Sequence, residues 1–101
     1  MVELDLEVFK ALSNSNRVVI LAKLLERPRR VTELSRELGL SPPLVHINLK
    51  KLMRAGLVRE GQGVVSKRHR SPPLIEAYYE AVEFRLEVTP QAVKRLAEEV
   101  E

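Results

Sequence analysis

The chain has no cysteine and no tryptophan, and only four of its 101 residues are glycine. The absence of cysteine excludes disulfides, thiolate metal sites and cysteine nucleophiles. No apolar run reaches 18 residues, so no transmembrane helix is expected. The acidic start Met-Val-Glu-Leu-Asp-Leu-Glu lacks the basic start and apolar stretch of a signal peptide. We therefore expect a cytoplasmic protein without a membrane partner.

Catalytic patterns are also missing. The sequence contains no Gly-rich phosphate loop, no cluster of histidine with carboxylates, and no Ser/His/Asp set at a familiar spacing. An enzyme is therefore not expected, and neither is a cofactor.

Basic residues are concentrated in one part of the chain. Residues 1–74 hold 14 Lys and Arg against seven Asp and Glu, whereas residues 75–101 hold three against seven. Within residues 17–70 the numbers are 13 and four. A basic block of this kind is typical of a protein that binds a polyanion, although a solvated surface rich in Arg is the plainer explanation.

The segment 31–56 has the pattern of a helix-turn-helix. Leu34 and Leu38 give a short first helix, with Thr32 as its expected N-cap, and Gly39 suits the turn that ends it. Ser41 is a good N-cap for the second helix, 42–55, and Pro42 fits the first position of that helix. Two helices joined by a short turn containing Gly favour insertion of the second helix into a DNA major groove.

The whole chain, 1–101, is predicted to be a single winged-helix domain, mainly α with a small β-hairpin. Two helices, at 3–12 and about 16–26, precede the motif, and the apolar residues of the second nearly surround it, so we expect it to be largely buried. A wing occupies about 57–88, with Gly61-Gln-Gly63 as a flexible point or bulge. Strand structure is favoured for 82–88 and more weakly for 75–81, where a helix is the alternative. Thr89-Pro90 starts a final helix at 90–100.

These stretches resemble the ArsR-type winged-helix transcriptional repressors. The resemblance rests on five segments: Phe9-Lys-Ala-Leu-Ser13 with Asn16-Arg17 and Ile20-Leu21, Thr32–Ser41, Val45, Leu49–Val58, and Phe84–Pro90. It covers residues 5–60 well and 80–100 loosely. It implies a cytosolic homodimer, joined through its terminal helices and bound to a two-fold-symmetric operator.

The chain departs from the metal-sensing members of that family. The positions of their Cys-x-Cys pattern correspond to Arg30 and Thr32 here, and the last helix lacks the Asp and His of their second site. Metal sensing through the family's known sites is therefore not expected.

Candidate DNA-binding residues lie mostly on the second helix of the motif. His46 and Asn48 could bond base edges, and the lysines could reach phosphates. Asn48 could instead be half-buried, bonding only backbone groups. Leu44 and Ile47 should project outward, toward thymine methyl groups or toward a protein. The full set on this helix is Pro43, Leu44, His46, Ile47, Asn48, Lys50, Lys51 and Arg54.

Further candidates flank that helix. Arg29, Arg30 and Arg36 could clamp phosphates or be ordinary surface charge, while Arg17 is expected to pack or pair locally. The cluster Lys67, Arg68, His69 and Arg70 at the wing is predicted to contact the DNA backbone or minor groove, with a solvated loop as the alternative. Candidate dimer contacts are Leu4, Val8, Val93, Leu96 and Val100.

The sequence therefore predicts a sequence-specific regulator of transcription, a homodimeric repressor that binds double-stranded DNA. The alternative is a winged helix that serves as a protein-interaction module in a larger transcription or replication assembly. Exposed Leu44 and Ile47 would suit that alternative, whereas a basic wing would not.

Overall fold

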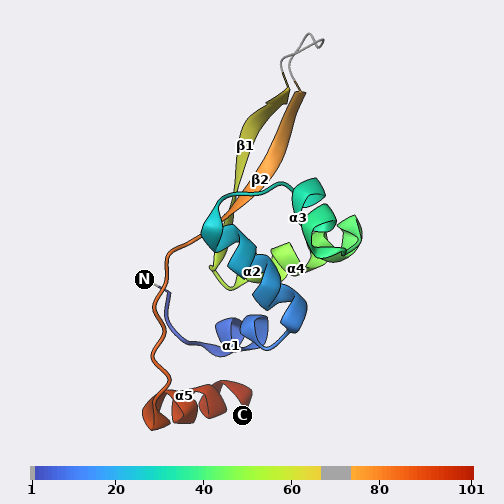
Figure 1. The fold of residues 1–101 in the computed structure, drawn as a ribbon. Helices are drawn as coiled ribbons and strands as arrows, with labels where there is room; N and C mark the ends of the chain where they lie inside the picture. The colour runs from blue at the N-terminus through green and yellow to red at the C-terminus, as the bar shows by residue number, and fades with distance from the viewer. Residues whose placement is uncertain (1, 67–73) are drawn as a thin grey trace.

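The computed structural model describes residues 2–66 and 74–101. In chain order these residues form α1 (Leu6–Leu12), α2 (Ser15–Glu26), α3 (Val31–Leu38), α4 (Pro42–Arg54), β1 (Val58–Ser66), β2 (Leu74–Ala81) and α5 (Pro90–Val100). The first four helices form the body, the hairpin of β1 and β2 projects from it, and α5 lies at the opposite end (Figure 1). The predicted winged helix-turn-helix with an added helix at each end is confirmed.

Local signals set the helix boundaries. The Ser41 hydroxyl accepts a hydrogen bond from the Leu44 N–H at 3.3 Å, and Thr89 accepts one from Ala92 at 3.1 Å. Proline follows both caps, as predicted. Gly39 ends α3 with φ 67°, a conformation that costs glycine nothing. The predicted cap Thr32 is wrong: α3 starts at Val31, because the Glu33 carboxylate accepts from the Arg30 N–H at 3.1 Å.

The core lies where α1, α2, α3 and α4 meet the base of the hairpin. Its fully buried side chains are Val8, Ile20, Leu34, Val45, Leu49, Leu52 and Leu57. The expectation of a largely buried second helix is wrong in part. Ile20, Leu21 and Leu24 are buried, but Val18 and Leu25 are 45% and 56% exposed, because α2 packs on its neighbours through one face only.

The hairpin is antiparallel, with Val58 opposite Ala81 and Gly61 opposite Tyr78. The interruption expected at Gly61–Gly63 does not occur; β1 is continuous there, and its irregularity falls between Val64 and Ser66. A side chain at position 61 would overlap the Tyr78 ring, since a Cβ there would lie 2.7 Å from it. Glycine at this position lets the ring lie across β1.

Strand structure at 75–81 is confirmed over the alternative of a helix, whereas the strand favoured for 82–88 is wrong. The last bond to the hairpin side runs from the Val82 N–H to the Leu57 carbonyl at 2.9 Å, and no described strand lies opposite the residues that follow. The alternation is nevertheless real, because Phe84 and Leu86 pack against the core while Glu83 and Arg85 are exposed. Period two here reflects an extended segment crossing the body without a partner strand.

Candidate nucleic-acid interface

The outer face of α4 is the most accessible part of the helix-turn-helix. Val45, Leu49 and Leu52 anchor the helix in the core, which turns its opposite face to solvent. The exposed residues on that side are Pro43, His46, Ile47, Lys50, Lys51 and Arg54, while Leu44 is half-buried. The structure thus brings six of the eight candidates on this helix to the surface.

His46 is held from the wing side. Its ring lies edge-on to the Tyr79 ring of β2, with centroids 6.5 Å apart. Tyr79 is itself buried, and burial raises the pKa of its hydroxyl. A buried aromatic neighbour therefore limits the positions that the His46 imidazole adopts on the outer face of α4.

The interpretation of Asn48 as a base reader is wrong. Its side chain is only 4% exposed, and both ends of the amide are engaged within the protein. Nδ2 donates to the Leu44 carbonyl at 2.9 Å, and Oδ1 accepts from Arg17 at 3.1 Å. Asn48 thus tethers α4 to the N-terminal part of α2.

Arg29 is likewise not a phosphate clamp. Its guanidinium is buried in an ion-pair network, donating to both Glu37 oxygens and to Glu26, each at 3.2 Å. It also bonds the Lys23 and Arg27 carbonyls. Through its hydrogen bonds, Arg29 lowers the pKa of Glu37, and Glu37 in turn raises the pKa of Arg29. The predicted clamp instead joins α2 to α3.

The Arg29 backbone also fixes the hairpin. Its N–H donates to the Tyr79 carbonyl at 3.0 Å, and the Tyr79 N–H donates to the Arg29 carbonyl at 2.7 Å. This isolated antiparallel bridge holds β2 against the loop before α3. The wing is therefore oriented relative to α3 and α4 by a backbone link that the sequence pattern did not predict.

The other arginines differ in their surroundings. Arg36 is exposed on α3, whereas Arg30 is half-buried and donates to Glu33 at 3.1 Å. The bonds from the backbone and side chain of Arg30 lower the pKa of Glu33. On the hairpin, Arg59 pairs with Glu80 at 2.6 Å. Lys67, Arg68, His69 and Arg70 lie outside the described residues.

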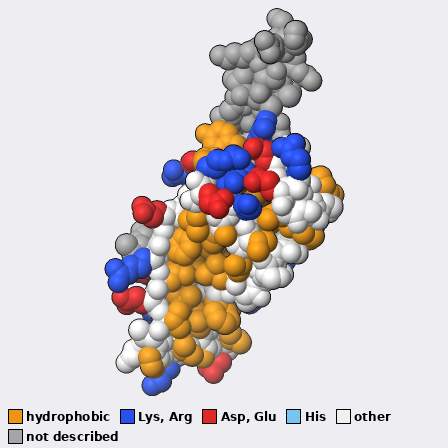
Figure 2. Space-filling model, viewed as in Figure 1, with side chains coloured by type: hydrophobic (Ala, Val, Ile, Leu, Met, Phe, Trp, Pro, Cys, Tyr) orange, Lys and Arg blue, Asp and Glu red, His pale blue; other side chains and the backbone are white. Residues whose placement is uncertain are grey.

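The candidate dimer contacts separate into two groups. Val8 and Leu96 are buried within this chain, so their assignment to an interface is wrong. Val93 and Val100 are 53% and 70% exposed, and Leu4 is half-buried. Figure 2 shows apolar side chains running over the α2 and α1 face toward α5, below a cluster of charges of both signs. The chain therefore leaves an apolar surface open beside its terminal helices.

Sequence reasoning missed Tyr79 and Glu37, and placed Arg17 only as a local contact. Arg17 is 9% exposed and joins the end of α1 to Asn48 on α4. Glu37 lies eight positions from Arg29, and Tyr79 lies 50 positions away, so no helical or strand spacing connects them. The adjacent Arg29 and Arg30 in the loop before α3 were the sequence feature that pointed to this region.

The described residues hold neither a membrane-spanning helix nor a cluster of metal ligands. None of the helices in residues 2–66 and 74–101 is both long and apolar enough to cross a membrane. Within the same ranges, no three His, Cys, Asp or Glu side chains are grouped so that they could hold a metal ion.

Comparison with known proteins gives concordant results. Residues 14–60 match the family described as "Bacterial regulatory protein, arsR family". An uncharacterized HTH-type transcriptional regulator of Methanocaldococcus jannaschii is 36% identical over 89 residues, which are 88% of this chain and 87% of that protein.

Solved structures show the same fold. HlyU from Vibrio cholerae is 26% identical with a TM-score of 0.57, covering 91% of this chain and 79% of that one. An ArsR-like transcriptional regulator from Rhodococcus sp. RHA1 is 24% identical with a TM-score of 0.59, covering 93% and 71%. Because the Rhodococcus regulator is only 24% identical, its likeness to this chain shows the fold alone.

Proposed function

Because this chain belongs to the arsR family and is a DNA-binding helix-turn-helix regulator of transcription, we propose that it acts as a homodimeric repressor that reads its operator with α4. The observation that carries the proposal is the outer face of α4, where Pro43, His46, Ile47 and Lys50 stand exposed on a helix anchored in the core. A helix presented in this way fits the width of the major groove. Occupancy of an operator would exclude polymerase from overlapping DNA.

Base contacts are assigned to His46 and Ile47, and phosphate contacts to Lys50 and Arg36. A His side chain donates to guanine, and an apolar side chain packs on the thymine methyl group. Ile47 is 54% exposed. Its exposed neighbours on α4 are mostly polar, which favours DNA over an apolar protein partner. Lys67, Arg68 and Arg70 supply further phosphate contacts in the proposal, as the sequence predicts.

Binding to promoter and random duplexes tests the proposal, measured by fluorescence anisotropy at about 50 and 200 mM salt. If six to ten phosphates are contacted, affinity falls by ~10³–10⁵-fold over this range. His46→Ala should change the order of preference among operator variants, whereas Lys50→Gln should weaken all duplexes alike. In transcription from its own promoter, added protein should reduce product. Absence of binding at low salt would reject the proposal.

The dimer is proposed to form through α5 and the apolar surface beside it. An 11-residue helix is marginal on its own, and α5 packs on α1 while leaving Val93 and Val100 open. A second copy would cover both valines. Val93→Glu with Val100→Glu should give a monomer by light scattering, whereas Lys94→Glu, on another side of α5, should leave the dimer intact. A wild-type monomer at micromolar concentration would contradict the proposal.

A further inference from the structure

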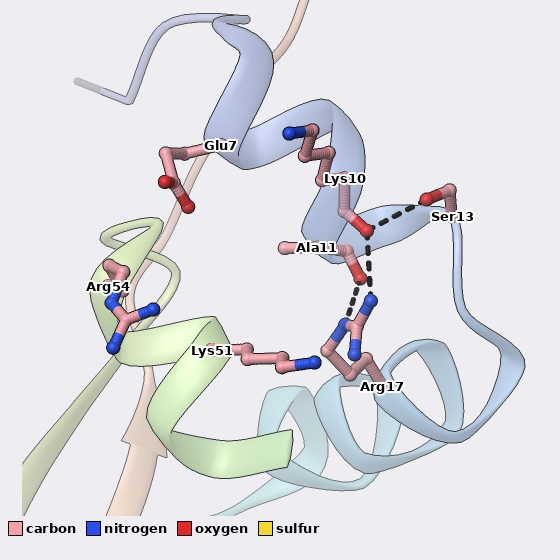
Figure 3. A pocket seen from close by; sticks show the side chains of 7 residues that line it. All are labelled: Glu7, Lys10, Ala11, Ser13, Arg17, Lys51 and Arg54. Atoms are coloured by element: carbon pink, nitrogen blue, oxygen red, sulfur yellow. Dashed lines mark hydrogen bonds between the residues drawn. The ribbon is translucent and has the colours of Figure 1, made fainter. Parts of the chain in front are cut away.

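A pocket of about 420 Å³ lies between α1, the N-terminal part of α2 and the C-terminal half of α4. Its lining residues are Glu7, Lys10, Ala11, Ser13, Arg17, Lys51 and Arg54. Figure 3 shows Glu7 and Lys10 extending from α1, Lys51 and Arg54 from α4, and Arg17 closing one side. The volume falls within the ~300–1,000 Å³ range of small-molecule sites. It is far larger than a single water or monatomic ion requires.

The charge of this pocket is unbalanced. Four cationic side chains and one carboxylate line it. Among the described residues, Lys10, Lys51 and Arg54 form no ion pair, although the opposing carboxylate of Glu7 shares the same cavity. Solvated lysines on an open surface are unremarkable, but three unpaired cations from two helices that converge on one cavity create a local positive potential.

Arg17 adds a buried cation to this set. It is 9% exposed, and its hydrogen-bond partners among the described residues are all neutral: the Ala11 carbonyl at 2.9 Å, the Lys10 carbonyl at 3.1 Å and Asn48 Oδ1 at 3.1 Å. Buried charges in proteins are usually paired with an opposite charge. Arg17 has its hydrogen bonds but, among the described residues, no counter-charge within ion-pair distance.

We propose that this pocket binds a small anion that carries phosphate or carboxylate groups. Lys10, Lys51 and Arg54 would contact the anionic groups through charge-assisted hydrogen bonds, and Arg17 would supply the buried positive charge beneath them. Glu7 offsets only one of the four cations, so the lining keeps a net positive charge toward a compact anion such as pyrophosphate.

An anion bound in the pocket contacts α4 and thereby changes the affinity for DNA. This step rests on the proposed function. Lys51 and Arg54 belong to the helix proposed to enter the groove, so a bound anion places negative charge beside the DNA phosphates. It also fixes the end of α1 against α4 through Arg17 and Asn48. The anion therefore lowers the affinity for DNA, and Lys51 and Arg54, predicted from the sequence as DNA contacts, serve the pocket instead.

Calorimetric titration of the full chain with pyrophosphate tests the site, at constant ionic strength and without DNA. Saturable one-to-one binding is expected. Lys51→Gln should weaken it by about tenfold or more, since a charge-assisted bond is lost. Lys50→Gln is the matched control, because it removes the same charge from the next position of α4 outside the pocket, and it should leave pyrophosphate affinity unchanged. Equal losses in both variants, or no saturation by about 10 mM, a millimolar limit for weak ligands, would overturn the proposal.

Measurements of DNA binding in the presence of pyrophosphate distinguish the anion site from the proposed function. Pyrophosphate should reduce wild-type affinity for DNA more than chloride of equal ionic strength does, and Lys51→Gln should abolish that difference. If the pocket takes a phosphate of DNA itself, Lys51→Gln will weaken DNA binding while free pyrophosphate fails to bind, which contradicts a small-anion site. If DNA does not bind at all, the calorimetric result still decides whether the pocket holds an anion.

Discussion

Two arginines are buried in the part of the chain that the structure describes, and their charges are balanced in opposite ways. Arg29 is 5% exposed and is met by the carboxylates of Glu37 and Glu26. Arg17 is 9% exposed, and within the described ranges its partners are carbonyl and amide oxygens alone. Both guanidiniums use their planar array of donors, so hydrogen bonding alone does not distinguish them.

What separates the two is the space around them. The carboxylates beside Arg29 come from α2 and α3, and the network fills the junction where the hairpin meets the body. Arg17 instead borders a cavity of about 420 Å³ that other cations share. A buried cation with internal counter-charges stabilises the fold, whereas one that faces a positive cavity leaves room for a ligand. The comparison thus assigns Arg29 to architecture and Arg17 to recognition.

The largest expected effect on stability comes from removing Arg29, the buried cation that has carboxylate partners. Arg29→Met removes the main partner of Glu37, which keeps only Lys23 at 3.8 Å, and it takes a side-chain donor from the Lys23 and Arg27 carbonyls. The joint between α2, α3 and the hairpin is thereby loosened. The melting temperature should fall on the order of 10 °C. Arg36→Met is the control, because Arg36 is exposed on α3, and it should change the melting temperature little. Equal melting temperatures for wild type and Arg29→Met, followed by circular dichroism, would show that the network does not stabilise the fold.

A carboxylate placed beside Arg17 should balance its charge, as Glu37 balances the charge of Arg29. Figure 3 shows the Lys51 ammonium group directed toward Arg17, so Lys51→Glu places a carboxylate there. Pyrophosphate affinity should fall more than about tenfold, because the lining goes from four cations and one carboxylate to three cations and two carboxylates. The melting temperature should stay close to that of wild type. Lys50→Glu should retain pyrophosphate binding, and loss of binding in both variants would remove the distinction between the pocket and the helix surface.

Acid should weaken the Arg29 network selectively. Arg29 holds the pKa of Glu37 below its ordinary value of 4.5, so the ionised carboxylate contributes stability fully above pH 4.5. That contribution is lost as the pH falls through the lower pKa of the folded state. Glu37→Gln should therefore melt below wild type at pH 7, and the gap should shrink at about pH 3. A gap that is unchanged with pH would mean that Glu37 acts by hydrogen bonding alone.

The smallest effect is expected from a cation that is paired but not buried. Arg59 and Glu80 lie opposite each other across the hairpin, and the Arg59 side chain is 67% exposed. Arg59→Ala should change the free energy of unfolding by about 0.5 kcal/mol or less, since exposed pairs are screened by water. Urea denaturation of this variant beside Arg29→Met measures the contrast. A loss as large as that of Arg29→Met would show that burial is not what separates the two pairs.

Much of this fold could be predicted from local chemistry. Ser41-Pro42 and Thr89-Pro90 start helices because a hydroxyl cap and a proline act over three or four residues. Gly39 ends α3 through its own backbone freedom. The alternation at 82–88 was visible, but whether an extended segment joins a sheet depends on a partner strand, and the spacing within one segment carries no information about that partner.

The candidate site was less predictable. The residue types on α4 indicated DNA binding, yet the assignments of Asn48 and Arg29 were wrong because both side chains are used internally. A single Arg or Asn in a sequence is equally suited to a phosphate, a base or a carboxylate of its own chain. Only the position of Glu37 and Arg17 decides between these partners.

The sequence by itself determined the order of helices and strands, the helix-turn-helix and the basic character of the first three quarters of the chain. These depend on capping, hydrophobic periodicity and composition, which act over a few residues or over the whole. The tertiary structure decided which polar side chains remain for a partner. It buried Asn48 and Arg29, exposed His46, Ile47 and Lys50, and brought Lys10 and Lys51 from distant helices around one cavity. Burial and charge compensation arise between segments far apart in the chain, so they exist only once the chain has folded.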